Sequence, residues 1–591
     1  MCGIIGYIGK NNASSIILEG LKNLEYRGYD SVGVAFITPE GVVVKKDKGK
    51  VEEVHEKLNF LEHETNLAIG HTRWATHGKV SKENAHPHTD CDSKIAIVHN
   101  GIIENYQELK ENLISSGHIF KSETDSEVIS HLIEEELKKG KNFEEACCFA
   151  FNKLKGTFAV LAVKEDEHKI IAVRRGSPLV LGIADHGYFA ASDIPAFLQH
   201  TKQVIYLYDY DFVILDSEPK IFNIQEGKLT RVERPIHSID WDAEKAKKGE
   251  FEHFMLKEIC EQVETIQRVA AQKKEEVEKI VEEMKRAHSI FFVGCGSSYH
   301  ACLTASYLFS KIAKKHVNVL LASEFPNYEH FLNSDTVVIA VSQSGETYDV
   351  LEAVRTAKKK GSKVISIVNV MGSSLMRESD SFLPMNAGPE ICVLSTKTYT
   401  SQLTLLTLLA YAFDGKFEEG KNKLKYLWNI IYNLTSANMR NKIKELAEKL
   451  KDKEHIFCIG RGLQYATALE AALKIKEASY IHAEAFASGE LKHGSIALIE
   501  DSTPCIVFVS EENEKETISN VMEVKSRGGY VVGISPNYNE IFDFWIKVPE
   551  AGNENPIIQI IPIQILAYQL AVLRKINPDY PRNLAKSVTV K

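Results

Sequence analysis

The second residue of the chain is a cysteine, and its position allows a particular nucleophilic chemistry. Removal of the initiator methionine before a small residue leaves Cys2 with a free α-amino group. An α-amine has a reference pKa of about 7.7 to 8.0 and a thiol one of about 8.5, so near neutral pH the amine can serve as the base for its own thiol. A cysteine can also stand at position 2 by chance, so the interpretation depends on its surroundings.

Polar strings interrupt the apolar runs of the first 240 residues, at places where substrate-binding loops normally lie. These strings are residues 26–31 (YRGYDS), 72–78 (TRWATHG), 99–101 (HNG) and 124–125 (TD). An arginine can bind a carboxylate through two hydrogen bonds, an aspartate can hold an ammonium group, and an asparagine with a glycine amide can stabilise an oxyanion. Together these groups fit an amino acid whose side-chain amide is cleaved.

With Cys2, these strings resemble the class II, N-terminal-nucleophile glutamine amidotransferases, and the resemblance runs through the whole first section. It implies that Cys2 attacks the glutamine amide and that Asn100 and Gly101 form the oxyanion hole. Taken alone, Trp74 and His77 would more often be packing or surface groups, and their place in the string at 72–78 is what favours a functional role. The other implied roles are binding of the α-carboxylate and α-amine by Arg73 and Asp125, shaping of the glutamine pocket by Thr76 and His77, support of the Cys2 end by Arg27, and gating of ammonia passage by Trp74.

Two glycine- and serine-rich turns stand between apolar runs and helical patterns in the second half of the chain. They are residues 294–298 (GCGSS) and 341–347 (VSQSGET). Hydroxyl groups and glycine amides at the start of a helix form an anion site. Neither turn continues as G-K-[S/T] or completes G-x-G-x-x-G, so a nucleotide is not indicated. Each turn alone is often only a helix cap, but two in one domain favour a phosphate ester.

Glu470, Lys474 and Glu477 are spaced four and three residues apart, so on the predicted helix they share one face. A surface ladder of ion pairs is the plainer interpretation of that spacing. The segment that follows at 482–494 (HAEAFASGELKHG) resembles a signature of sugar isomerase (SIS) domains, and this resemblance favours catalysis instead. Moving a sugar carbonyl from C2 to C1 requires a base that carries a proton between those carbons, and a carboxylate in a partly dry site can do this.

The second half resembles the pair of sugar isomerase (SIS) domains of the glutamine:fructose-6-phosphate aminotransferases, and with the first section the resemblance covers essentially the whole chain. The sequence departs from the residues that are common in this family at Ser297, Leu394 and Ser495, and these departures concern loop geometry and not the chemistry. The polar tail 576–591 would ordinarily be frayed, but the resemblance places it in the sugar site and along the route of ammonia. The implied roles are phosphate binding by Ser342, Gln343, Ser344 and Thr347, sugar binding by Ser298, Val393 and Ser395, proton transfer by Glu477 with Lys474 and Glu470, ring opening by His493, and a Schiff base at Lys586.

The pattern of apolar runs predicts the elements that must position these residues. The first section is α+β, with strands of stacked sheets and helices at 12–23 and 124–139; the resemblance makes it a four-layer αββα glutaminase. The second half is duplicated, because HSIFFVGCGSSYHACLTASY from His288 aligns with HIFCIGRGLQYATALEAAL from His455. Each copy alternates strands and helices, which predicts a parallel sheet covered on both faces. The predicted divisions are a glutaminase at 1–240, a helical linker at 241–287, SIS domains at 288–428 and 429–575, and a tail at 576–591.

Bulk composition limits the function classes. The 591 residues are 44% hydrophobic and 26% charged, as in globular proteins. A formal charge of −9 gives no reason to expect nucleic acid. No basic leader or long apolar run is present, which predicts a cytoplasmic protein without a membrane span. Ten cysteines without C-x-x-C predict reduced thiols, and neither His482-Ala483-Glu484 nor His86-Pro87-His88 has metal-site spacing, so we expect no metal and no cofactor.

Two alternatives stay open beside the main interpretation. A non-catalytic sugar-phosphate sensor would have lost the nucleophile or the lysine, whereas both Cys2 and Lys586 are present. An aminotransferase or deglycase that acts on another sugar phosphate would keep both. The resemblance implies L-glutamine and D-fructose 6-phosphate as substrates, D-glucosamine 6-phosphate as product, and a homodimer formed through the SIS domains.

Overall fold

The computed structural model describes residues 2–75, 77–239 and 248–589. Contacts within the chain divide it into two compact units. The first consists of Met1–Ala246 with Ala585–Lys591, and the second of Lys247–Leu584.

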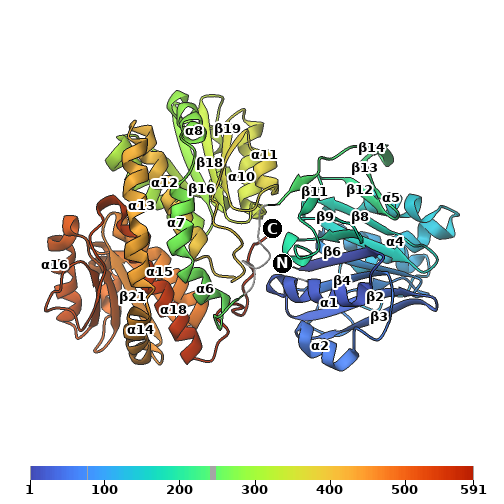
Figure 1. Ribbon diagram of the computed structural model, residues 1–591, viewed down its shortest axis with the longest axis horizontal. Helices are drawn as coiled ribbons and strands as arrows, with labels where there is room; N and C mark the ends of the chain where they lie inside the picture. Colours follow the sequence, from blue (N-terminus) through green and yellow to red (C-terminus); the bar gives the residue numbers. More distant parts are fainter. Residues whose placement is uncertain (1, 76, 240–247, 590–591) are drawn as a thin grey trace. The chain divides into compact units, whose positions relative to one another are not determined.

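Two antiparallel sheets lie face to face in the first unit (Figure 1). The first sheet has the order β15-β11-β9-β10-β1-β4-β2-β3, and the second β14-β13-β12-β8-β7-β6-β5. The strands of the first are β1 (Gly3–Gly9), β2 (Ser31–Thr38), β3 (Gly41–Lys48), β4 (Leu67–Arg73), β9 (Val180–Ala184), β10 (Gly187–Ala191), β11 (Gln203–Tyr206) and β15 (His237–Ser238). Those of the second are β5 (His88–Thr89), β6 (Ile95–Ile103), β7 (Gly156–Lys164), β8 (Ile170–Arg175), β12 (Asp211–Leu215), β13 (Pro219–Gln225) and β14 (Lys228–Arg231).

Alternating side chains along β1 show how the layers form. Ile5 and Tyr7 pack with α1 (Ala13–Leu24), whereas Ile4 and Ile8 face the second sheet. Helices α4 (Glu127–Lys138) and α5 (Phe143–Lys153) cover the outer face of the second sheet; α2 (Val51–Leu58) and α3 (Tyr106–Ser115) complete the helices of this unit. The predicted four-layer αββα arrangement is therefore confirmed.

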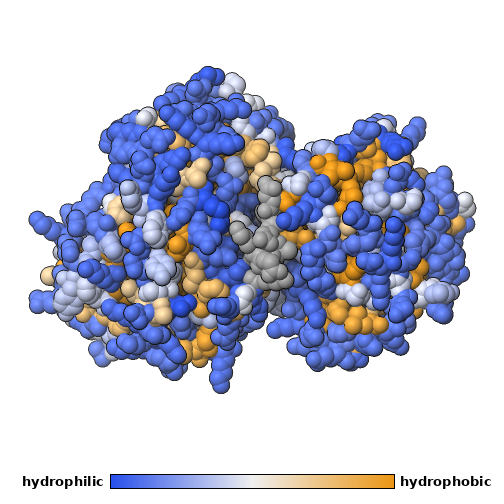
Figure 2. All heavy atoms as spheres, viewed as in Figure 1, coloured by the Kyte–Doolittle hydropathy of each residue, from blue (hydrophilic) through white to orange (hydrophobic). Residues whose placement is uncertain are grey.

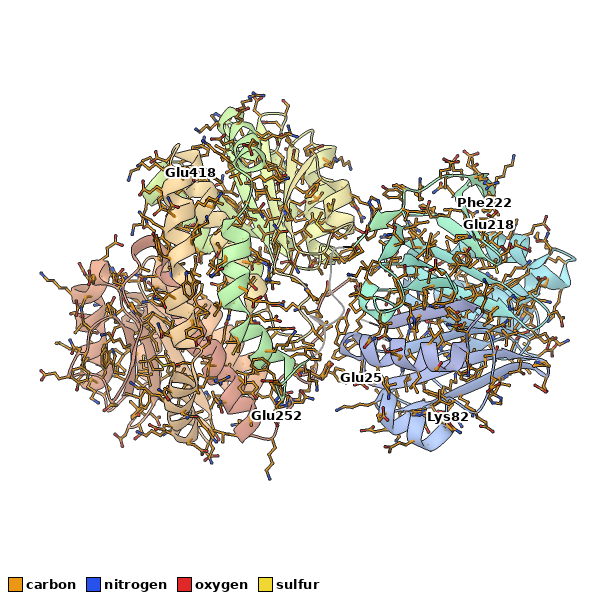
Figure 3. The ribbon with its side chains drawn as sticks, in the orientation of Figure 1. Glu25, Lys82, Glu218, Phe222, Glu252 and Glu418 are labelled. Atoms are coloured by element: carbon orange, nitrogen blue, oxygen red, sulfur yellow. The ribbon has the colours of Figure 1, made fainter. Side chains whose placement is uncertain are left out.

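Local chemistry fixes where two of these helices begin. The Asn12 side chain accepts a hydrogen bond from the Ser14 N–H (3.0 Å) and caps α1. Glu25, labelled in Figure 3, accepts from the N–H of Val51 at 2.8 Å, so its carboxylate caps the first turn of α2.

The second unit contains two parallel five-stranded sheets with the same strand order, β17-β16-β18-β19-β20 and β22-β21-β23-β24-β25. This repeat confirms both the duplication and the parallel sheets predicted from the sequence. The strands of the first copy are β16 (Ser289–Gly294), β17 (Asn318–Leu321), β18 (Thr336–Ser342), β19 (Lys363–Val368) and β20 (Ser381–Pro384). Those of the second are β21 (His455–Gly460), β22 (His482–Ala487), β23 (Pro504–Phe508), β24 (Tyr530–Ser535) and β25 (Phe544–Lys547).

One continuous apolar core joins the helices of both copies. The segment predicted as a linker supplies three of these helices, and Met255, Ile259 and Ile280 on them are buried in that core. Glu418, labelled in Figure 3, lies in the first turn of α13, where a negative charge is favourable. The helices are α6 (Phe254–Cys260), α7 (Gln262–Ala270), α8 (Lys274–Arg286), α9 (Ser297–Leu308), α10 (Tyr348–Lys359), α11 (Ser374–Glu378), α12 (Lys397–Phe413), α13 (Phe417–Leu434), α14 (Ala437–Leu450), α15 (Leu463–Ser479), α16 (Glu514–Lys525), α17 (Asn555–Gln559) and α18 (Ile561–Leu573).

One helical segment, Gly552–Leu573, is long and apolar enough to cross a membrane by length and composition. Its most apolar stretch is 83% buried inside the protein, as expected for a core helix. The face seen in Figure 2 is mostly hydrophilic, with apolar residues gathered in several small groups.

Candidate active sites

Cys2 immediately precedes β1 and lies beside the end of β4. Its Sγ accepts a hydrogen bond from the N–H of Trp74 (3.2 Å) and lies 3.4 Å from the Trp74 carbonyl oxygen. The Cys2 carbonyl oxygen accepts from Asn100 Nδ2 at 2.8 Å and from Arg27 Nε at 3.2 Å. The buried Arg27 side chain in turn forms an ion pair with the half-buried Asp193 (2.8 Å). These contacts hold the thiol at a fixed place beside two strands.

Asn100 and Gly101 lie next to Cys2 on β6. The Oδ1 atom of Asn100 is buried without a hydrogen-bond partner in the described part of the chain, while its Nδ2 points to the Cys2 carbonyl. Gly101 has a φ of +128°, and a Cβ there would lie 2.0 Å from the Thr157 carbonyl oxygen. Only glycine fits this position, which keeps the backbone close to the nucleophile.

A pocket that is partly open to solvent surrounds the thiol. Arg73 donates to the carbonyl oxygens of His77, Gly78 (3.3 Å) and Lys79 (3.2 Å). Asp125 Oδ2 accepts from the N–H of Ile103 at 2.8 Å, which fixes one oxygen of that carboxylate. The side chains and backbone that line the pocket belong to Cys2, Arg73, Trp74, His77, His86, His99, Asn100, Gly101, Thr124, Asp125, Ser126, Ser177, Pro178, Ala585, Ser587, Val588 and Thr589.

The pocket thus brings together almost all residues predicted to handle glutamine. Thr76, the remaining one, lies outside the described residues. Trp74 is half-buried, and its ring meets that of Tyr29 edge-on at a centroid distance of 5.5 Å. The tail residues beside Lys586 also line this pocket, and Lys586 itself is half-buried in the segment that packs with the first unit.

Burial raises the pKa of the Cys2 thiol, and the Trp74 backbone hydrogen bond and the Arg73 charge oppose this only in part. The thiol is therefore protonated near neutral pH and needs a base before it can attack. In the described part of the chain its hydrogen bonds are those to the Trp74 backbone. A free α-amino group on the same residue would supply the missing base.

In the second unit, the turn after β18 forms a hydroxyl-lined loop at the start of α10. The Gly345 N–H donates to Ser342 Oγ (3.0 Å), which lies 3.3 Å from Thr347 Oγ1. The Ser344 hydroxyl accepts from the Glu346 N–H at 3.2 Å. Parallel strands place this loop beside the β16–α9 turn that carries Ser298, so both serine-rich turns meet at one sheet edge.

The Glu470, Lys474 and Glu477 side chains of α15 are not a surface ladder. Lys474 Nζ lies 2.6 Å from Glu477 Oε2 and 3.4 Å from Glu470 Oε1, and the side chains of Glu470 and Lys474 are 0% and 1% exposed. Burial alone would lower the pKa of Lys474, but Glu477 and Glu470 together raise it above its ordinary value. The result is a charged, nearly dry row of acid and base groups with Glu477 at its more exposed end.

Known proteins resemble each part of the chain. A family model for a glutamine amidotransferase domain matches residues 71–199, and one for a SIS domain matches residues 283–412 and 449–574. Glutamine–fructose-6-phosphate aminotransferases (isomerizing) from Thermococcus kodakarensis, Pyrococcus horikoshii and Methanothermobacter thermautotrophicus are 48%, 46% and 46% identical, each over 100% of both chains.

The chain belongs to the glutamine–fructose-6-phosphate aminotransferase (isomerizing) family. The solved C-terminal domain of glucosamine-fructose-6-phosphate aminotransferase from Francisella tularensis is 35% identical, with a TM-score of 0.53, and covers 56% of this chain and 99% of its own. Tagatose-6-phosphate ketose/aldose isomerase from Escherichia coli, at 16% identity and a TM-score of 0.50 over 56% of this chain and 96% of its own, shares the fold alone.

Within this aminotransferase family member, two residues of α9 join the acid–base row, a role that the sequence did not predict for either. Ser297 Oγ donates to Glu470 Oε1 (2.8 Å), and His300 Nδ1 lies 2.8 Å from Glu470 Oε2. A histidine three residues after a serine on a helix carries no distinctive signal in the sequence. Only the packing of α9 against α15 brings it to Glu470.

The remaining residues predicted for the sugar site are spread over several elements of this aminotransferase chain. Val393 N–H donates to the carbonyl oxygen of Asp579 (3.1 Å), and Ser395 Oγ lies 2.7 Å from Thr398 Oγ1 at the start of α12. Gln343 is half-buried in the loop after β18. His493 ends the short 3-10 helix Glu490–His493, where its side chain is exposed and not in hydrogen-bond contact with the described α15 residues.

Proposed function

We propose that this chain converts D-fructose 6-phosphate and L-glutamine to D-glucosamine 6-phosphate and L-glutamate. The observation that carries the proposal is the presence, on one chain, of a half-buried cysteine at position 2 in a pocket and of a buried acid–base row on a duplicated SIS fold. Aminotransferases of that name match the chain from end to end.

At the first site, Cys2 Sγ attacks the amide carbon of glutamine after the α-amine has taken its proton. Asn100 Nδ2 and the Gly101 N–H donate to the oxyanion of the tetrahedral intermediate. The proton is then delivered to the amide nitrogen, ammonia leaves and a thioester remains, which water hydrolyses to glutamate. Arg73 and Asp125 orient glutamine through its α-carboxylate and α-amine.

At the second site, Ser342, Gln343, Ser344 and Thr347 bind the phosphate, and Ser298, Val393 and Ser395 hold the sugar. His493 assists ring opening. The Lys586 amine forms a Schiff base at C2 of the open ketose, and ammonia displaces it to leave an imine at C2. Glu477 then removes a proton from C1 and returns one to C2, which gives the C1 aldehyde and the C2 amine.

Lys474 and Glu470 position Glu477 for this transfer. Lys474 keeps its charge between the two carboxylates, and its Nζ holds the Glu477 carboxylate in place at 2.6 Å. Glu470 is anchored at both oxygens by α9, so the row cannot move away from the β16–α9 turn.

Isotope transfer tests the proposal and the coupling of its two halves. The purified chain receives glutamine labelled with ¹⁵N in the amide, fructose 6-phosphate and excess unlabelled ammonium. We expect glucosamine 6-phosphate that carries the label, because ammonia released at Cys2 passes inside the protein beside Trp74. Product that carries mainly unlabelled nitrogen would refute the internal route.

Variants and substrates complete the test. The Cys2→Ala variant should lose synthesis from glutamine and keep synthesis from ammonium. If wild type makes no glucosamine 6-phosphate but aminates another ketose phosphate, the chain is instead an aminotransferase that acts on another sugar phosphate, as the sequence leaves open. We also propose a cytoplasmic homodimer formed through the SIS domains, without membrane, nucleic acid or cofactor; light scattering of the purified chain tests its mass.

A further inference from the structure

Four side chains of the first unit converge at a point outside the glutamine pocket. They are Cys91, His118, His131 and Glu134, and one donor atom from each lies within 4.8 Å of all the others. The Sγ of Cys91 is 3.7 Å from His118 Nδ1 and 3.6 Å from His131 Nδ1, and the two Nδ1 atoms are 3.3 Å apart. Glu134 Oε2 lies 3.0 Å from the first of these nitrogens and 3.1 Å from the second. We call this group the Cys91 cluster.

The Cys91 cluster is assembled from three separate segments. Cys91 follows β5, His118 lies in the loop between α3 and α4, and His131 and Glu134 are one turn apart on α4. The side chains of both histidines are at most 1% exposed, that of Glu134 is 7% exposed, and Cys91 is half-buried. A surface group of charges would not explain this degree of burial.

The distances fit a single tetrahedral ion. Zinc binds histidine nitrogen at about 2.0 to 2.1 Å and thiolate sulfur at about 2.3 Å, so a tetrahedron sets neighbouring donors roughly 3.3 to 3.6 Å apart. The nitrogen–nitrogen distance of 3.3 Å and the sulfur–nitrogen distances of 3.6 and 3.7 Å agree with that spacing. The carboxylate oxygen is slightly closer, at 3.0 and 3.1 Å from the nitrogens.

Carboxylates also face the outer nitrogen of each ring. His118 Nε2 lies 3.1 Å from Glu135 Oε2, and His131 Nε2 lies 3.6 Å from Glu127 Oε1. His118 Nε2 is within hydrogen-bond distance of Glu135, so a proton on that nitrogen leaves His118 Nδ1 as a lone pair that faces His131 Nδ1 and Glu134 Oε2. A positive charge among these donor atoms, such as a metal ion, removes the repulsion between their lone pairs. Carboxylates behind histidine ligands are the usual outer partners of a zinc ion.

We propose that the Cys91 cluster binds one Zn²⁺ ion through Cys91 Sγ, His118 Nδ1, His131 Nδ1 and Glu134 Oε2. Binding releases the thiol proton to solvent, and the thiolate with the Glu134 carboxylate then balances the charge of the ion. The protein supplies all four ligands, which leaves no position for water or substrate and makes the site structural. The ion ties α4 and the preceding loop to the end of β5.

Metal titration of the full-length chain tests this site. The chain is stripped with a chelator, returned to metal-free buffer and titrated with Zn²⁺ against a chromophoric chelator, and separately with Co²⁺. We expect one tight equivalent of Zn²⁺ and, with Co²⁺, a sulfur-to-metal charge-transfer absorption with the intense visible bands of a tetrahedral ion. A stripped chain that binds no tight equivalent, or a cobalt spectrum without the thiolate band, would overturn the proposal.

Variants assign the ligands. Cys91→Ser and His118→Gln should each weaken Zn²⁺ binding by about 100-fold or more, since loss of outer partners alone costs about 10- to 100-fold. Cys148→Ser, which changes a buried cysteine of the same unit, and Cys2→Ala, which removes the pocket thiol, should bind Zn²⁺ like wild type. Wild-type affinity in a folded Cys91→Ser chain would contradict the assignment, and if that variant does not fold, the cobalt spectrum of wild type still decides it.

Discussion

Replacing Lys474 by methionine removes the only cation that the described structure places between Glu470 and Glu477. Methionine has a similar length and fills the same buried volume, so the change is mainly one of charge. Two carboxylates would then share a nearly dry helix face without compensation.

The size of the effect follows from that burial. Removing one partner of a buried ion pair costs about 3 to 5 kcal/mol. The chain can avoid this cost by binding a proton at the carboxylate pair, because burial of two like charges favours the neutral form of one of them. The base is needed in its ionised form, so activity near neutral pH should fall, by up to the roughly 10²- to 10⁴-fold that a general base contributes.

The assay is glutamine-free synthesis of glucosamine 6-phosphate from ammonium, measured from about pH 6 to about pH 9 in constant excess of free ammonia. Lys474→Met should recover activity as the pH rises, whereas wild type should not require the higher pH. Lys476→Met, at an exposed position of the same helix, is the matched control. A loss that is equal at every pH would show that Lys474 only supports the fold, and the reasoning about the proton would fail.

Three further changes have defined outcomes. Gly101→Ala puts a Cβ 2.0 Å from the Thr157 carbonyl oxygen, so glutamine hydrolysis should fall by about 10²- to 10³-fold while synthesis from ammonium remains. Asp125→Asn keeps an acceptor for the Ile103 N–H but removes the charge, and KM for glutamine should rise by about 10-fold or more with a smaller change in kcat. Burial lowers the pKa of Lys46 to about 8 from 10.5, so between these two pH values the folded chain binds fewer protons than the unfolded chain. The free energy of unfolding of the first unit, measured in urea, should therefore rise by about 3 kcal/mol as the pH rises through that window. The Lys46→Met variant should not show this rise.

Much of the fold could be predicted because apolar residues recur with different periods in strands and in helices. The helices predicted at 12–23 and 124–139 are α1, Ala13–Leu24, and α4, Glu127–Lys138. The charged stretch at 241–287 was predicted as a helical linker from its composition. Its helices bury a narrow apolar stripe, including Ile280, behind exposed charges, so an averaged composition suggests a linker although the stripe joins the core.

The predicted glutamine residues lie around one pocket because their motifs follow strand ends, and strand ends meet at a sheet edge. The Cys91 cluster could not be found in that way. Its members come from a strand end, a loop and a helix, and only the His131 and Glu134 pair has a helical spacing, which is also typical of an ordinary ion pair. The sequence therefore predicted no metal, because it contains no compact ligand motif. Only the folded first unit brings the four donors together.

The position of α4 connects the inferred ion to catalysis. Asp125 stands two residues before the helix begins, and His131 and Glu134 follow in its next turns. An ion at the Cys91 cluster would therefore hold the helix whose start presents Asp125 to glutamine, while Cys2, Asn100 and Gly101 are held by β1 and β6. Removing the ion should raise KM for glutamine more than it lowers kcat. If chelation instead lowers glutamine hydrolysis to the same extent in wild type and in the Asp125→Asn variant, the ion supports the whole unit and not Asp125 in particular.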